Sequence, residues 1–330
     1  MTLSLKPVTM MAVSAVATSL AVGLAGSASA LTLGDYNLVV FEDLQSNSEV
    51  EGNAFIGGNL SGSSSNYCIK CNSGGNFQPF DGVGLKVVGN IEGNPKQVNN
   101  GADLQYGGNL NSIVNMNGGG SKSQNSALAT EFGQLKNFLT NTSSELSNLG
   151  ANSTVVIPGQ QPGAVKFNSS GDDIAVFNID ASQLFSNKTQ QIELNLNGSE
   201  SAVINVSGTS ANWTQGNIVG GFTGDSIQQK VLWNFYEAET LNFNNALHGS
   251  LLAPLAHLTN QTEMEGSIVV KSFNQRGEVH LPVFTGKLPK KEIPAEEVPE
   301  PSFMLAAALG LGFISKFKRI SSSSNRKAES

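Results

Sequence analysis

Short apolar runs at close intervals are the sequence feature that most limits how this chain can fold. Between Lys230 and Gly286 each run ends at Asn, Gly, Pro, Gln or a charged residue, which is typical of short strands separated by turns. The gaps are too short for crossover helices. A meander or a coil whose rungs stack in parallel would fit this spacing, and we expect the coil, because it explains corners that recur between rungs. The runs are residues 231–235, 241–243, 250–253, 256–259 and 267–273.

We therefore predict an all-β fold, a right-handed parallel β-helix (β-solenoid), with a β-sandwich as the alternative. Apolar and polar residues alternate in IELNL and VINVS, which indicates strands with one buried face. Further strands are predicted at residues 153–157, 174–179, 191–196 and 202–206.

A Gly-Asn pair recurs through the first part of the chain. Gly and Asn adopt positive φ more readily than other residues, so the pair suits tight corners between stacked strands. Type I′ hairpin turns use the same chemistry, and the spacing separates the two only weakly. The pairs are Gly52-Asn53, Gly58-Asn59, Gly75-Asn76, Gly89-Asn90, Gly93-Asn94 and Gly108-Asn109.

One amphipathic helix is predicted from Ser126 to Gly150, with Ser126 as its cap and Gly150 at its end. Its apolar face needs a hydrophobic surface, so we expect it to lie lengthwise against the coil. The polar segment 141–144 could divide it in two. The apolar positions are Leu128, Phe132, Leu135, Phe138, Leu139, Leu146 and Leu149.

Composition and charge limit the class of partner. The chain of 330 residues is 39% hydrophobic and 14% charged, with 36 Gly, as expected for one turn-rich domain with a sizeable core. Its formal net charge is −7, and the two ends carry several of the basic residues. Acidic surfaces repel phosphate backbones, so nucleic acid is not an expected partner.

The first 30 residues are predicted to be a signal peptide. Lys6 precedes an apolar region at residues 10–24, and Ala28-Ser29-Ala30 has the small-x-small pattern of a cleavage site, with Ala28 and Ala30 as its small residues. The alternative is a short membrane anchor, but small and polar residues interrupt the apolar run. We expect export.

The composition changes again after Gly286. Residues 287–298 form a charged, Pro-rich linker, and residues 299–330 follow as a tail with an apolar run at 303–314. The signature Pro299, Glu300, Pro301 and the basic Lys316, Lys318 and Arg319 resemble a PEP-CTERM sorting tail. That resemblance implies an exosortase-type processing enzyme and transient membrane contact through the tail. Because the apolar run is short for a span, and the chain continues past the basic cluster, an uncut anchor is the alternative.

Several phrases in order resemble the choice-of-anchor A adhesive domain of bacterial surface proteins. They are LGDYNLVVFEDLQSNSEVEGNAFIGGNL, LWNFYEAETLNF, HGSLLAPLAHL, MEGSIVVKSF and VHLPVFTG. The HGSLLAPLAHL phrase is also similar to rungs of ice-binding-like β-helical adhesins. The resemblance, placed on residues 31–286, implies a secreted, non-catalytic domain that binds envelope or extracellular polysaccharide or matrix protein at the cell surface. Ice binding itself is not expected, because a regular Thr-x-Thr array is missing.

Cys68 and Cys71 are the only cysteines and lie in a Gly/Asn/Ser-rich segment. In an exported protein a local disulfide is expected, with free thiols or a redox or metal role as alternatives. A zinc site would need ligands that the neighbouring sequence lacks.

The remaining candidates for chemistry are weak. His248 and His257 could share an edge if rungs stack, but surface histidines are more often hydrogen-bonded than metal ligands. The acidic Asp172, Asp173 and Asp180 fit no calcium motif and are interpreted as a solvated turn. We expect neither metal nor cofactor.

The rival function is a polysaccharide-active lyase or hydrolase on the same fold. Glycoside cleavage needs two opposed carboxylates. The candidates are two i, i+2 pairs, each expected on one side of a strand: Glu237 with Glu239, and Glu263 with Glu265. No nucleophile elbow or phosphate loop is present. The sequence favours a binding protein over an enzyme.

Overall fold

A computed structural model describes residues 32–72 and 77–289. The signal peptide, nearly all of the linker and the sorting tail predicted from the sequence lie outside the described residues. The chain divides into one compact unit that ends at Lys287 and a second that begins at Leu288. The description below concerns the first unit.

The protein is mostly β, with three sheets built almost entirely from parallel strands. The main path of the largest sheet runs, in spatial order, through β11 (Lys122–Gln124), β9 (Asp103–Tyr106), β7 (Val83–Val87), β4 (Ala54–Ile56), β1 (Leu38–Val40), β24 (Ile268–Gln275), β22 (Ser250–Asn260), β19 (Val231–Asn234), β16 (Ser201–Ser207) and β14 (Ile174–Asp180). Four strands pair off this path: β2 (Leu44–Ser46), β5 (Leu60–Ser61), β17 (Ser210–Trp213) and β20 (Thr240–Phe243).

The other two sheets are smaller. The second consists of β10 (Val114–Met116), β8 (Lys96–Val98), β6 (Ser65–Tyr67), β3 (Glu49–Val50), β25 (Val279–His280), β23 (Met264–Glu265) and β21 (Leu247–His248). The third consists of β12 (Thr154–Val156), β13 (Gly163–Asn168), β15 (Thr189–Asn195) and β18 (Asn217–Val219). The helical segments are α1 (Leu128–Ser147), α2 (Ala181–Leu184), α3 (Asp225–Gln228), η1 (Leu33–Asp35) and η2 (Gly220–Phe222).

Strand direction argues against the β-sandwich that the sequence left as an alternative. Among the described strand pairs, only β12 and β13 are antiparallel. Consecutive strands enter different sheets, as when β6, β7, β8 and β9 alternate between the second and the first. An antiparallel β-sandwich does not fit this pairing, because its sheets are built from antiparallel strands.

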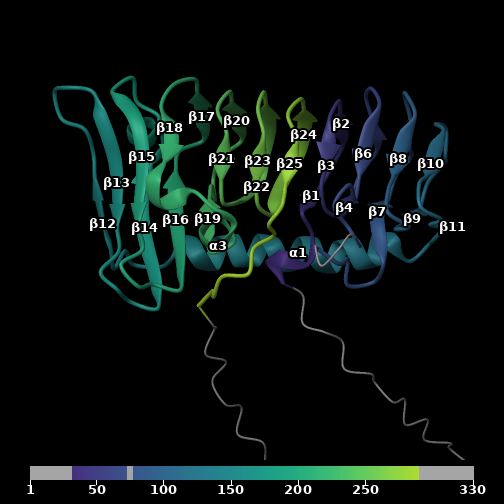
Figure 1. The fold of residues 1–330 in the computed structure, drawn as a ribbon, viewed down its shortest axis with the longest axis horizontal. Coiled ribbons are helices and arrows are strands. Elements are labelled where there is room, and N and C mark those ends of the chain that lie inside the picture. Colours follow the sequence, from purple (N-terminus) through teal and green to yellow (C-terminus); the bar gives the residue numbers. More distant parts are fainter. Residues whose placement is uncertain (1–31, 73–76, 290–330) are drawn as a thin grey trace, which may run out of the picture. The chain divides into compact units, whose positions relative to one another are not determined.

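The first described strand, β1, lies in the middle of the largest sheet, between β4 and β24 (Figure 1). From there the chain proceeds to β11 at one end of the sheet, and α1 then follows in sequence (Figure 1). After α1 the chain forms β12 and β13 of the third sheet. It then re-enters the largest sheet at the far end with β14 and returns through β16, β19 and β22 to β24. Strands β1 and β24 therefore lie side by side, although they are far apart in the sequence.

The largest sheet buries apolar residues on both faces. Eight large apolar residues of the stretch 230–286 are buried, but two of them, Leu232 and Leu252, lie outside the central apolar cluster. They alternate along their strands with Trp233 and Leu251, which belong to that cluster, and α1 contacts both strands. Leu232 and Leu252 therefore lie on the face of the sheet that α1 covers. The eight are Leu232, Phe235, Leu241, Phe243, Leu251, Leu252, Ile268 and Val270.

Helix α1 differs from its prediction at both ends and in its middle. Its N-cap is Ala127, whose N–H donates to Asn125 Oδ1 at 2.9 Å, so Ser126 is not the cap. It ends at Asn148 in a right-handed conformation, so Gly150 is not needed as a terminator. The helix is also undivided through residues 141–144. Ser143 lies on its buried face and donates to Asn234 Oδ1 at 2.6 Å, which gives the polar segment a partner in the sheet.

Positive φ is not the reason for most of the Gly-Asn pairs. Among the described pairs, only Gly93 has a positive φ. Glycine is needed elsewhere because neighbouring coils approach closely: a Cβ on Gly89 would lie 2.6 Å from the carbonyl oxygen of Gly58. The asparagines hold the coils in register. The N–H of Asn90 donates to Asn59 Oδ1 at 2.9 Å, and the N–H of Asn109 donates to Asn90 Oδ1 at 2.8 Å. Gly75-Asn76 lies outside the described residues.

Candidate binding surface

Six consecutive parallel strands form a wall with one buried and one exposed row of side chains. The strands are β17, β20, the second halves of β22 and β24, β2 and β5. The alternate residues that point inward are apolar and buried: Ala211, Leu241, Leu258, Phe273, Leu44 and Leu60. The residues that follow them in each strand point outward, in matched register: Asn212, Asn242, Thr259, Asn274, Gln45 and Ser61. We call these six residues the polar row.

All six side chains of the polar row are uncharged amides or hydroxyls. Asn212, Asn242 and Gln45 are exposed, and the other three are half-buried. Among the described residues, no side-chain hydrogen bond joins any of them to the rest of the protein. Neighbouring strands in a sheet lie about 4.7–4.9 Å apart, so the row presents donors and acceptors at a regular interval. Their hydrogen-bonding capacity is directed at solvent or at a ligand.

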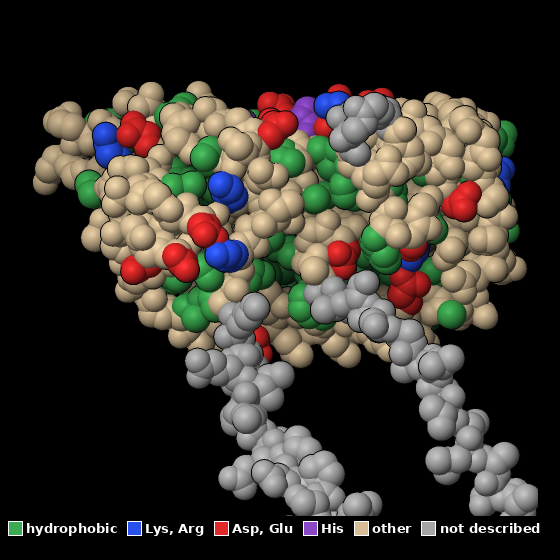
Figure 2. All heavy atoms as spheres, turned by 60° about the horizontal axis from the view of Figure 1, so that its bottom comes forward, with side chains coloured by type: hydrophobic (Ala, Val, Ile, Leu, Met, Phe, Trp, Pro, Cys, Tyr) green, Lys and Arg blue, Asp and Glu red, His purple; other side chains and the backbone are tan. Residues whose placement is uncertain are grey.

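Charged residues make up only 14% of the chain. On the face shown in Figure 2, acidic and basic side chains lie singly or in small groups among uncharged polar surface. Apolar exposure is also scattered, with Leu255 and Ile113 among the large exposed side chains. Recognition by a surface of this kind depends on hydrogen bonds more than on long-range charge.

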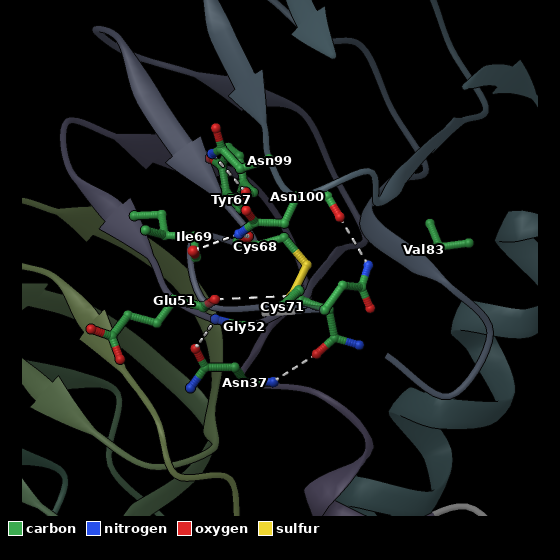
Figure 3. The surroundings of a disulfide bond; sticks show 12 residues. Asn37, Glu51, Gly52, Tyr67, Cys68, Ile69, Cys71, Val83, Asn99 and Asn100 are labelled. Carbon is green, nitrogen blue, oxygen red and sulfur yellow. Dashed lines mark hydrogen bonds between the residues drawn. A yellow bond between two sulfur atoms is a disulfide. The ribbon is translucent and has the colours of Figure 1, made fainter. Parts of the chain in front are cut away.

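Cys68 and Cys71 are joined by a disulfide, and both residues are fully buried (Figure 3). The Asn100 side chain fixes this corner, because its Nδ2 donates to the carbonyl oxygens of Cys68 at 2.9 Å and Ile69 at 2.6 Å. Cys68 has a φ of 60°, which the bridge and these hydrogen bonds hold in place. The bridge lies in the connection between β6 and β7, where it closes a short local loop.

The histidines do not gather as the sequence suggested. His248 lies in β21 of the second sheet and His257 in β22 of the first, so the hypothesis that they share an edge is wrong. His248 instead pairs across the ladder with Glu265, and His257 Nδ1 lies 2.8 Å from Ser272 Oγ. Within the described part of the chain, no three His, Cys, Asp or Glu side chains are grouped to hold a metal ion.

The acidic candidates have local structural roles. Asp180 caps α2, and the hydrogen bonds from Ser182 hold the pKa of its carboxyl below the ordinary value. Glu237 accepts a hydrogen bond from the N–H of Gly208 at 2.6 Å. Glu237 and Glu239 lie in the connection between β19 and β20, so their expected position on one side of a strand is wrong. Asp172 accepts from Ser170 Oγ at 2.7 Å, within a turn.

A family model described as "Putative Ice-binding-like adhesive domain" matches residues 29–281. The chain belongs to this family. The match contains every described strand, from β1 to β25. The ice-binding-like adhesive family is one of binding domains, which indicates a non-catalytic role at a surface.

A solved structure is similar to this chain at low identity. It is the crystal structure of an ice binding protein from an Antarctic bacterium of the Flavobacteriaceae, with 12% sequence identity and a TM-score of 0.32 over 77% of this chain and 82% of the other. Curated proteins give no match. Within the described residues, no helix has both the length and the apolarity to cross a membrane.

The polar row is not visible in the sequence. Its members come from six strands spread from residue 45 to residue 274, and only the pairing register places them together. The available signal was local: in TLNF and SANW a polar residue stands between two buried ones. That alternation identifies a side chain that points outward, but not which side chains of other strands lie beside it in the folded protein.

Proposed function

We propose that this protein is an exported, non-catalytic adhesive protein that binds a surface polysaccharide through the polar row. The observation that carries the proposal is the set of six side chains in matched register, none of which forms a side-chain hydrogen bond within the described part of the chain. Amide and hydroxyl groups both donate and accept, as sugar hydroxyls do. A matrix protein, the other partner suggested by the sequence, would be favoured by aromatic or arginine anchors, and the polar row has neither.

The proposal includes a β-solenoid with right-handed coils as the scaffold. The parallel pairing of the strands supports it. So does the order in which the chain alternates between sheets: β19 and β20 lie in the largest sheet, β21 in the second, β22 again in the largest and β23 again in the second. The same architecture explains why the row is regular, because each coil adds one outward side chain. Within the adhesive family, we assign the chain to the choice-of-anchor A proteins on its ordered sequence phrases.

Export and sorting complete the proposal. The leader with Ala28 and Ala30 would direct export, and the tail with Pro299-Glu300-Pro301 would bring the protein to an exosortase-type enzyme during transient membrane contact. Membership in an adhesive family supports a surface location. Terminal sequencing of the protein recovered from cells tests both ends: retention of residues 1–30 and of residues 302–330 would contradict it.

The binding experiment compares the full chain with two triple variants on a panel of insoluble polysaccharides. The row variant carries Asn212→Ala, Asn242→Ala and Gln45→Ala. The control carries Gln134→Ala, Asn137→Ala and Gln191→Ala, which remove three exposed amides elsewhere. Hydrogen bonds contribute about 0.5–1.5 kcal/mol each, so the row variant should bind at least about tenfold more weakly. The control should bind as the wild type does. Equal binding by both variants, at unchanged melting temperature, would contradict a role for the polar row.

A further inference from the structure

A pocket of about 420 Å³ lies where the last coil meets the first. It is lined by residues of α3, by strands β23 and β25, by Glu51 directly after β3, and by the segment 281–285. Ligand pockets commonly span about 300–1,000 Å³, so this one has room for a small molecule or for one unit of a polymer. It belongs to a different surface from the polar row, because its strands come from the second sheet.

The floor of the pocket is a row of alternating acidic and imidazole side chains. Glu265 pairs with His280 across β23 and β25, and Glu51 follows Val50, which pairs with Val279. His280 Nε2 lies 3.8 Å from Glu51 Oε1. The Glu265 and Glu51 carboxylates, which accept hydrogen bonds, therefore lie on either side of the His280 ring, which can donate or accept.

The protein holds both carboxylates in fixed positions. Glu51 is 7% exposed; its Oε2 accepts from the Leu281 N–H at 3.0 Å, and its Oε1 lies 2.6 Å from Lys70 Nζ. The Glu265 carboxylate forms hydrogen bonds with the side chains of the buried Gln228 and of His248. Groups already oriented by the fold lose little freedom when a ligand binds.

The wall of the pocket adds polar groups that the fold leaves available. Among the described residues, no hydrogen bond or ion pair engages the side chains of Asp225, Gln229 or Thr285. Leu281 and Phe77 supply apolar lining. The pocket thus combines a carboxylate, an amide and a hydroxyl with apolar surface, beside the fixed floor.

We propose that this pocket binds one neutral sugar residue. Sugar hydroxyls donate to carboxylates and accept from amide and ammonium groups at once, so they match a lining in which both kinds alternate. The lining carries three carboxylates, from Glu51, Asp225 and Glu265, which disfavour phosphate and other anions. The inference rests on the proposed function: the pocket would recognise a single sugar residue of the class of polysaccharide that the polar row binds.

Titration with monosaccharides tests the pocket. Isothermal calorimetry with the full chain would use glucose, galactose, mannose and N-acetylglucosamine at millimolar concentration, with glucosamine and inorganic phosphate for comparison. At least one neutral sugar should bind. Asp225→Ala and Gln229→Ala should each weaken that binding about tenfold or more, while Asp172→Ala, an exposed carboxylate outside the pocket, should leave it unchanged.

The outcomes separate this inference from the proposed function. The polar-row triple variant should keep monosaccharide binding and lose polymer binding. No neutral sugar bound by the wild type, or sugar binding unchanged in both pocket variants, would overturn the pocket inference and leave the polar row standing. Binding of glucosamine alone would also overturn it, in favour of a cation site.

Discussion

At the residue scale, the fold tolerates buried polar side chains because, among the described residues, every buried side-chain nitrogen or oxygen except Thr262 Oγ1 has a hydrogen-bond partner. Lys96 belongs to β8 in the second sheet, and it is fully buried. Its Nζ donates to the carbonyl oxygens of Ser63 at 2.6 Å, Gly62 at 3.3 Å and Ser61 at 3.4 Å. Burying an ammonium group is costly even when carbonyls surround it. Burial lowers the pKa of Lys96 to about 8.

The depressed pKa of Lys96 predicts a specific pH dependence of stability. Between about pH 8 and 10.5, the unfolded chain keeps the Lys96 proton while the folded chain releases it, so this residue's contribution to stability rises with pH. Below pH 8 both states are protonated and the contribution is constant. In urea unfolding, the stability of the wild type relative to Lys96→Met should increase by up to about 2 kcal/mol from pH 7 to pH 9.5. A constant difference would show that the ammonium is not destabilised by burial.

At the element scale, α1 is attached to the sheet by side chains at both of its ends. Near its start, Glu131 Oε1 lies 2.5 Å from the buried Lys86 Nζ. Towards its end, a ladder of Asn178, Asn205 and Asn234 crosses β14, β16 and β19 in register. Asn205 Nδ2 donates to the Leu146 carbonyl at 2.8 Å, and Asn234 Nδ2 donates to the Ser143 carbonyl at 3.0 Å. The helix therefore has a fixed position along the strands as well as an apolar contact.

Strand β22 offers a matched pair of substitutions that tests this packing. Leu252 is fully buried on the face that α1 covers, and Leu255 in the same strand is 48% exposed. Leu252→Asp should lower the free energy of unfolding by more than about 3 kcal/mol, because the carboxylate loses water without gaining a partner. Leu255→Asp should cost less than about 1 kcal/mol. Chemical unfolding measures both, and equal costs would mean that α1 does not seal this face.

At the scale of the whole molecule, the seam between the first and last coils could not be predicted from the sequence. Short runs between turns were enough to predict parallel strands, and 3.6-residue spacing was enough to predict α1. Pairing of β1 with β24 joins residues about 230 positions apart, and local pattern contains no information on such distances. Asn37 illustrates this: its Nδ2 donates to the carbonyl oxygens of Gly266 at 2.7 Å and His280 at 2.9 Å.

The candidate sites depend on the same long-range pairing. The polar row crosses the seam between Asn274 and Gln45, and the pocket crosses it between His280 and Glu51. The acidic residues that were candidates for binding calcium, such as Asp172 and Asp173, are instead neighbours in the chain and lie in a local turn. Cys68 and Cys71 could be paired correctly because their bridge is local.

The side-chain amide resonances of the polar row test the central claim most directly. Asn212, Asn242, Asn274 and Gln45 each carry an NH₂ group that no other described part of the protein engages, so its NMR signal reports on an added ligand. On titration with soluble fragments of the bound polysaccharide, these four signals should shift together, while those of the buried Asn205 and Asn234 stay in place. Shifts confined to other amides, with the four row signals unchanged, would contradict binding through the polar row.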